Sequence, residues 1–378
     1  AQDTSGMQYT SASEGFWASL RVHFNSGERS DSDIEIKSSH GPYRIYGSSS
    51  RFGARGSNDL GNGLVGFYAY EVGMFARTGL ELETRQLHVG LRGAFGEVRA
   101  GSFWTAPFNM VYGSTDVANR QSGAIVFAPV GGFPNLLPGI ISRSVQYTTP
   151  DLNGFQGAVV ASMINDGPPG VSTRTNAKNT IDYWALAGSY SISGFTVAGT
   201  YNTRADYGDT LMHEDEPLDE FVRHAGGAHP EGEGVENDSF WCVECRYNDV
   251  DSWAIRLAYE QDNWYVTSWY GEIDYSGVSY IFDSTKDGVT TRVVNIPSDP
   301  KLFSFAAGIA VDNVDFYVVY DSVDNAQGAY SAKDNFGTVG VQYNFTSKSR
   351  IWAEYVGQKA GTEMYTDDYV NIGLRHDF

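Results

Sequence analysis

The feature of this sequence that most constrains its fold is a series of β-patterned segments joined by alternately short and long connections. Sixteen segments match a template in which apolar and polar residues alternate with a period of two. Within segment 251–261, for example, apolar Trp253 and Ile255 share one face of the predicted strand. We predict strands over residues 15–25, 42–56, 63–74, 82–93, 96–104, 139–149, 154–164, 181–191, 194–203, 251–261, 263–273, 301–312, 314–322, 334–345, 349–358 and 367–378.

The connections between these segments alternate in length along the whole chain. Short turns begin near residues 57, 93, 149, 191, 261, 312 and 346, and long connections lie near 26–41, 75–81, 105–138, 165–180, 204–250, 274–300, 323–333 and 359–366. Sixteen up-and-down strands with both termini on the short-turn side require this alternation, and membrane barrels show it. We therefore predict an all-β fold, a 16-stranded antiparallel transmembrane β-barrel, with residues 1–378 as a single domain.

Composition agrees with a barrel and excludes several other classes. The chain has 43 Gly, 24 Tyr and 21 Phe, and no run of apolar residues reaches the roughly 18 that a transmembrane helix needs. Mean hydropathy is −0.32, but alternating strands average to neutral in this measure. The net charge of −20 disfavours nucleic acid as a partner. The first residues, AQDTSG, lack a basic and apolar leader, so we expect a mature chain from which a signal peptide has been removed.

The stretch 101–139 interrupts this pattern of strands. It is rich in Gly and Pro, carries few charges and shows no period of two or 3.6, yet its apolar content is too high for a solvated tail. A barrel of sixteen strands leaves an aqueous channel. We expect the third long connection, about residues 105–138, to fold inward and narrow that channel.

Several segments of the chain resemble the general trimeric porins of Gram-negative bacteria. They are SRFGARGSNDLGNGLVGFYAYE (50–71), TRQLHVGLRGAFGEVRAGSF (84–103), SVQYTTPDLNGFQG (144–157), FTSKSRIWAEYVG (345–357) and VNIGLRHDF (370–378). The resemblance covers the ends of the chain better than its middle. It implies a homotrimer in contact with the lipid of the Gram-negative cell outer membrane, and a terminal Phe378 that the outer-membrane assembly machinery reads.

The resemblance also implies a set of charged residues at a channel constriction, because the family places wall arginines opposite acids on the third loop. By position, Arg51 and Arg55 match basic residues of the second strand, and Arg85 matches the fourth-strand arginine. Asp116 matches one acidic position of the loop, whereas Arg120 lies near the next, which weakens the acidic side.

Alternation by itself orients several of these side chains. It places Arg51 and Arg55 on one inward face of their strand, and it also points Arg21, Arg256 and Glu71 inward. The alternative for each arginine is a solvated residue of the wall without a role in selectivity. Arginine suits a fixed charge because it keeps its proton and presents a rigid fork of donors. Gln146 stands where many relatives carry arginine. Alternation along the predicted strand 82–93 puts Gln86 and His88 on its outward face, where they would fit a subunit interface.

The long connection 204–250 is strongly acidic and contains both cysteines. With Asp251 it holds 14 acidic and three basic residues, about half of the net charge. Such runs are usually a solvated outer face, and we expect no metal site here despite its histidines and carboxylates. Cys242 and Cys245 offer only two zinc ligands, which is too few, and we expect a small local disulfide instead.

These observations favour a passive channel for small hydrophilic solutes and ions that is not an enzyme and needs no cofactor. A substrate-selective porin for a sugar or an organic acid is the main alternative. A membrane-barrel hydrolase would need a nucleophile beside a base, but the chain has no GxSxG motif. A plugged barrel acting as an adhesin or receptor through its acidic loop is the remaining alternative.

Overall fold

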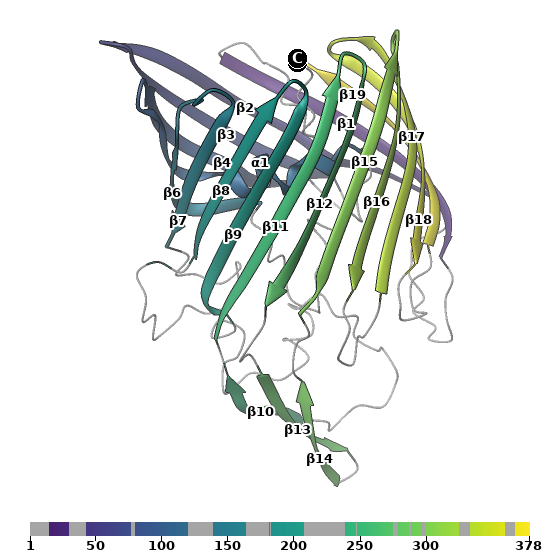
Figure 1. The fold of residues 1–378 in the computed structure, drawn as a ribbon. Coiled ribbons are helices and arrows are strands. Elements are labelled where there is room, and N and C mark those ends of the chain that lie inside the picture. The colour runs from purple at the N-terminus through teal and green to yellow at the C-terminus, as the bar shows by residue number, and fades with distance from the viewer. Residues whose placement is uncertain are drawn as a thin grey trace.

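A computed structural model gives the fold of the chain. It describes residues 15–29, 43–76, 80–119, 139–163, 181, 183–207, 239–246, 248–274, 279–286, 289–295, 299–324, 333–359 and 367–378. Sixteen of the strands close into one antiparallel barrel (Figure 1), which confirms the predicted fold class. They are β1 (Gly15–Arg29), β2 (Tyr43–Gly61), β3 (Leu64–Ala76), β4 (Leu80–Gly93), β5 (Gly96–Trp104), β6 (Ile140–Thr148), β7 (Phe155–Ser162), β8 (Tyr183–Ile192), β9 (Phe195–Tyr207), β11 (Asn248–Gln261), β12 (Trp264–Asp274), β15 (Lys301–Val311), β16 (Val314–Asp324), β17 (Lys333–Thr346), β18 (Ser349–Lys359) and β19 (Asp367–Asp377).

The barrel is closed by its first and last strands. Each barrel strand pairs with its neighbour in the order of the chain, and β1 then pairs with β19 in the register Ser19 to Asp377. The backbone N–H of Phe378 continues this pairing by donating to the carbonyl of Ala18 over 2.9 Å. Closure satisfies the backbone groups that an open sheet edge would expose, which is a condition for strands in a bilayer.

The two faces of the barrel wall differ in polarity. On β19 the apolar side chains of Ile372 and Leu374 are exposed on the outer surface, whereas Asn371 and Arg375 are buried on the inner one. The same alternation runs around the ring, so an apolar outer surface encloses a polar inner wall. Among the described residues, no helix combines the length and the apolar character needed to cross a membrane.

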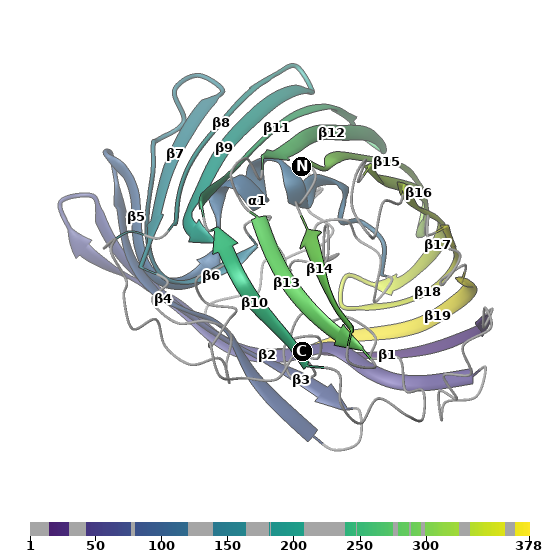
Figure 2. The same cartoon turned by 90° about the horizontal axis from the view of Figure 1, so that it is seen from below.

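Two regions predicted as loops contain further strands. β10 (Ser239–Arg246), β13 (Ser279–Lys286) and β14 (Val289–Asn295) form a separate three-stranded sheet in the order β10-β13-β14. Figure 1 shows this sheet beyond the end of the barrel that is opposite the short turns, and Figure 2 shows it in front of the ring of strands. The prediction of connections without strands over 204–250 and 274–300 was therefore wrong, because these short segments gain their hydrogen bonds by pairing across two connections.

The orientation predicted for Gln86 and His88 was also wrong. The pairing of β3 with β4 shifts between Glu71, opposite Gln86, and Val72, opposite Thr84, so that Arg85 is the extra residue of a β-bulge. A bulge moves the following residues to the other face of the sheet. Gln86 and His88 are accordingly buried on the inner side, while their neighbours Leu87 and Val89 are exposed outside.

Glycines on the inner wall let large aromatic rings lie flat against it. A Cβ atom added to Gly373 would come within 2.0 Å of the Trp352 ring, and one added to Gly340 within 2.3 Å of the Tyr317 ring. Both rings belong to the neighbouring strand and are buried. Each glycine thus leaves room for a ring that would otherwise project further into the barrel.

We expect Gly373→Val to destabilise the barrel by about 1–3 kcal/mol, because the new side chain overlaps the buried Trp352 ring. The matched control is Gly337→Val, since a Cβ atom added to Gly337 meets no other atom within 4 Å. Thermal unfolding in detergent, followed by the electrophoretic shift of the folded barrel, measures both variants. Equal unfolding midpoints for the two would contradict the packing role of Gly373.

Candidate functional site

The third long connection begins with a short helix whose start is set by local sequence. α1 (Ala106–Met110) follows Thr105, whose hydroxyl accepts a hydrogen bond from the backbone N–H of Phe108 over 3.4 Å. Pro107 lies in the first turn, where its missing N–H costs nothing. A 3-10 helix, η1 (Tyr112–Thr115), follows. The stretch predicted to lack secondary structure therefore contains two short helical turns.

The first part of this connection is attached to β6, β9 and β11 by three side chains of the inner wall. Gln146 accepts from the backbone N–H of Ala106 over 2.8 Å, and Arg256 donates to the carbonyl of Met110 over 3.1 Å. Asn202 donates to the hydroxyl of Tyr112 over 3.1 Å. Gln146 and Arg256 are thus used to hold the connection against the wall.

The second part lies against β12 and β15 through hydroxyl groups. The indole N–H of Trp269 donates to Thr115 Oγ1 over 2.9 Å, and the hydroxyl of Ser304 donates to the same atom over 2.6 Å. The hydroxyl of Thr267 donates to that of Ser114 over 3.2 Å. Thr115 and Ser304 are fully buried, so each bond is shielded from water.

Asn119 forms hydrogen bonds with side chains of β17 and β18. Its backbone N–H donates to Glu354 Oε1 over 2.6 Å, and its amide donates to Gln342 Oε1 over 3.3 Å. Residues 105–119 therefore contact inward-facing side chains from β6 to β18. Figure 2 shows α1 within the ring of strands.

A buried carboxylate gathers the predicted arginines of β2 and β4. Glu71 Oε1 lies 3.3 Å from Arg51 Nη1 and 2.6 Å from Arg85 Nε, and its Oε2 accepts from Gln86 Nε2 over 3.0 Å. The β-bulge at Arg85 brings both Arg85 and Gln86 to this carboxylate. The Arg85 guanidinium also lies 5.7 Å from the centre of the Trp104 ring. The structure thus brings together Arg51, Glu71 and Arg85.

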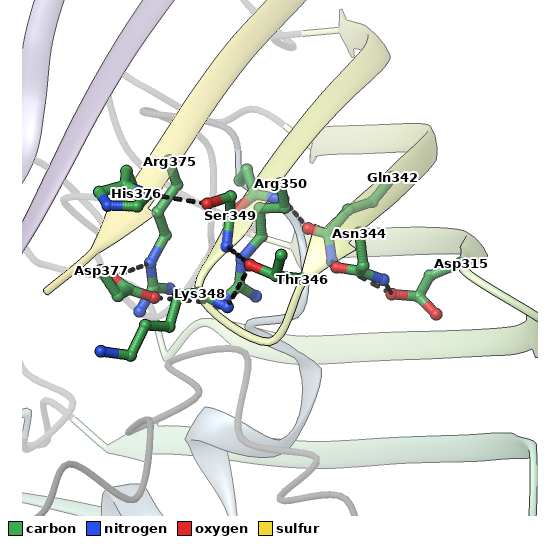
Figure 3. Close-up of polar contacts among 11 residues, drawn as sticks. Asp315, Gln342, Asn344, Thr346, Lys348, Ser349, Arg350, Arg375, His376 and Asp377 are labelled. Carbon is green, nitrogen blue, oxygen red and sulfur yellow. Dashed lines mark hydrogen bonds and ion pairs between the residues drawn. The ribbon is translucent and has the colours of Figure 1, made fainter.

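A second charged cluster lies near the short-turn end, on β18 and β19. Asp377 accepts from Arg375 Nε over 2.8 Å and lies 3.4 Å from Arg350 Nη2 (Figure 3). Arg21 is the cross-strand partner of Arg375. Alternation predicts that Arg375 and Asp377 share the inner face, but the sequence contains nothing that marks them as a cluster with Arg350.

The other predicted site residues are more dispersed. Arg55 lines a cavity of about 460 Å³ together with Trp17 and Glu71. Asp116 follows η1, which lies against β12 and β15, whereas Arg51 and Arg85 lie on β2 and β4. Arg120 lies outside the described residues, as does most of the acidic connection. Cys242 and Cys245 lie on β10, whose backbone is described but whose side chains are not.

Sequence reasoning missed the acids of the inner wall. Glu354 and Asp321 are each 2% exposed. Glu354 accepts hydrogen bonds from Tyr317 and from Asn371, over 2.7 Å for the latter, in addition to the bond from Asn119. The period-two alternation could have predicted them, because both acids alternate along their strands with lipid-facing apolar residues and therefore belong to the inner face.

This geometry defines a membrane-spanning barrel with a charged inner wall and a connection held inside it. The model of the Gram-negative porin family matches residues 18–378, and the chain belongs to that family. This places the protein in the outer membrane of a Gram-negative bacterium.

Individual relatives agree with this assignment. The major outer membrane protein P.IB of Neisseria gonorrhoeae is 32% identical over 158 residues, which are 39% of this chain and 42% of the relative. The chain thus matches less than half the length of that relative.

Solved porin structures share the fold. The anion-selective porin from Comamonas acidovorans has a TM-score of 0.63 at 15% identity, covering 96% of this chain and 98% of that one. OmpF of Salmonella typhi, solved with daunomycin, also scores 0.63 at 15% identity, covering 96% and 97%. Identities this low show the fold alone.

We expect Thr115→Val to lower the stability of the barrel by about 1–3 kcal/mol, because it leaves the buried Trp269 N–H without its acceptor. Valine has nearly the shape of threonine, so packing is preserved. Ser191→Ala is a control that removes an exposed hydroxyl bonded to Thr196. If both variants unfold at the temperature of the unchanged protein, the Thr115 anchor carries no stability.

Proposed function

We propose that the protein is a passive diffusion channel for small hydrophilic solutes and ions, narrowed by its third long connection. The observation that carries this proposal is the attachment of residues 105–119 to the inner wall of a barrel of sixteen strands. A barrel of this size holds water unless it is plugged. Solutes would cross down their gradients, without a bond being made or broken and without a cofactor.

We also propose that the channel is a homotrimer in contact with outer-membrane lipid. The apolar outer surface supports contact with lipid. One structural neighbour, OmpT of Vibrio cholerae, is described in a trimer form, with a TM-score of 0.59 at 14% identity over 97% of this chain and all of that one. The trimer of this chain is inferred from membership of the family.

The charges near the predicted constriction support weak selectivity that leans toward anions. Arg51 and Arg85 share the one carboxylate of Glu71, and Arg21 and Arg55 add further positive charge on the same side of the barrel. About half of the net charge of −20 comes from the acidic connection 204–250. The net charge of the whole chain therefore does not describe this part of the inner wall. Permeating ions respond to the local charges.

In planar bilayers we expect stepwise conductance in groups of three sublevels, with a reversal potential in asymmetric KCl that is near zero or of the anion-selective sign. Three sublevels follow from three parallel pores, and the sign follows from the surplus of arginines. A strongly cation-selective reversal potential at moderate salt would contradict the charge argument, and an absence of conductance would contradict the channel itself.

Glu71→Gln should move the reversal potential further in the anion-selective direction, because it removes the carboxylate that balances Arg51 and Arg85. Glu272→Gln removes the same charge from β12, where Glu272 pairs with Lys301 on the outer surface, and should leave the reversal potential unchanged. Equal shifts in both variants would show that only the overall charge matters.

One observation favours the alternative of a substrate-selective porin. On the inner wall the guanidinium of Arg92 lies 5.6 Å from the Phe67 ring, and that of Arg99 lies 5.5 Å from the Phe103 ring. Arg92, Arg99 and Phe67 border the cavity beside Glu71. A selective channel would saturate with its solute, whereas flux through a diffusion pore rises linearly with concentration, so liposome-swelling rates measured over a concentration series separate the two.

A further inference from the structure

Three arginines of the inner wall lie side by side across three neighbouring strands. In the pairing register Arg21 of β1 is opposite Arg375 of β19, which in turn is opposite Arg350 of β18. Arg350 and Arg375 are almost fully buried, and Arg21 is half-buried. We call these three residues the arginine row.

Such a row has an electrostatic cost. Like charges directly opposite each other on paired strands destabilise a sheet. Asp377 pairs with Arg375 and Arg350, so the four side chains together carry two excess positive charges. Arg21 is also repelled by Arg51, whose own ion pair is with Glu71. A partner with two negative charges would balance the row.

The backbone fixes the position of Arg21 at this point. The hydroxyl of Ser50 accepts from the backbone N–H of Arg21 over 2.9 Å and donates to its carbonyl over 3.1 Å. The pairing of β1 with β2 shifts register at the same place, between Ser19 and His23. The Nε atom of Arg21 is buried and donates to no residue that the structure describes. A buried guanidinium nitrogen needs an acceptor, which a bound water or an oxygen atom of a ligand supplies.

We propose that the arginine row is a binding site for a small oxyanion with two negative charges, of which inorganic phosphate is the simplest. Guanidinium groups bind phosphate oxygens through paired, charge-assisted hydrogen bonds. This inference rests on the proposed function to the extent that the anion reaches the row through the open interior. The row adjoins the Glu71 cluster where Arg21 meets Arg51, but its members lie on β1, β18 and β19 and share the carboxylate of Asp377.

The site lies at the short-turn end of the barrel. Arg375 is three residues from the terminal Phe378, and the backbone N–H of Asp377 donates to the carbonyl of Lys348 in the β17–β18 turn over 2.8 Å. Figure 3 shows Arg350, Arg375 and Asp377 grouped beside this turn. Short turns of membrane barrels face the periplasm. An anion held here would occupy the periplasmic end of the channel.

Isothermal titration of the detergent-purified protein with potassium phosphate at neutral pH tests the site without requiring conduction. We expect saturable binding that exceeds any response to potassium chloride at equal ionic strength. Arg21→Gln should weaken phosphate binding about tenfold, the effect of losing one charge-assisted hydrogen bond. Lys348→Gln removes the same charge from the exposed turn nearby and should bind phosphate as the unchanged protein does.

A second variant, expected to bind phosphate more tightly, distinguishes an effect on the site from a general loss of structure, which would only weaken binding. Asp377→Asn removes the carboxylate that occupies Arg375 and Arg350, so we expect tighter phosphate binding. Absence of phosphate binding to the unchanged protein, or equal affinity in Arg21→Gln and Lys348→Gln, would overturn the proposal. Phosphate binding to a barrel that does not conduct would support the site while contradicting the proposed channel.

Discussion

The structure depends on closure of the sheet by the pairing of β1 with β19. A bilayer offers no partner to a backbone N–H or C=O, so strands can cross it only when every edge is paired. The pairing from Ser19 to Asp377 supplies the last edge, and Phe378 extends it by one hydrogen bond to Ala18. Once the ring is closed, each strand has one face toward lipid and one toward the interior. The period of two in the sequence is the consequence of that division.

The interior is held together by polar contacts to which distant strands contribute. Residues 105–119 bond to Gln146, Arg256, Trp269 and Glu354, which lie on four different strands. Because each contact uses a buried donor or acceptor, moving the connection would leave several polar groups unsatisfied. The wall therefore positions this segment by many modest interactions. The same polar lining would keep the interior wet, which is what the proposed channel requires.

Charge is distributed unevenly around the inner wall. Arginines cluster on β1, β2, β4, β18 and β19, and the buried acids Glu354 and Asp321 lie further along on β18 and on β16. Glu71 holds two of the arginines in place, and Asp377 holds two others. The overall charge of the chain says little about this pattern. What an ion or solute meets inside depends on which carboxylate is already paired with which guanidinium.

The sequence alone determined the all-β class, all sixteen barrel strands and the inward orientation of Arg51 and Glu71, because alternation between two solvents is a local pattern. Only the tertiary structure decided the orientation of Gln86 and His88, since one extra residue at Arg85 reverses the parity that follows it. It also decided which residues meet inside, such as Asn119 with Glu354, 235 positions apart in the chain. The pairing of β10, β13 and β14 belongs to the same category. The contacts inside the barrel depend on the closed ring, whose curvature brings together side chains that no local pattern relates.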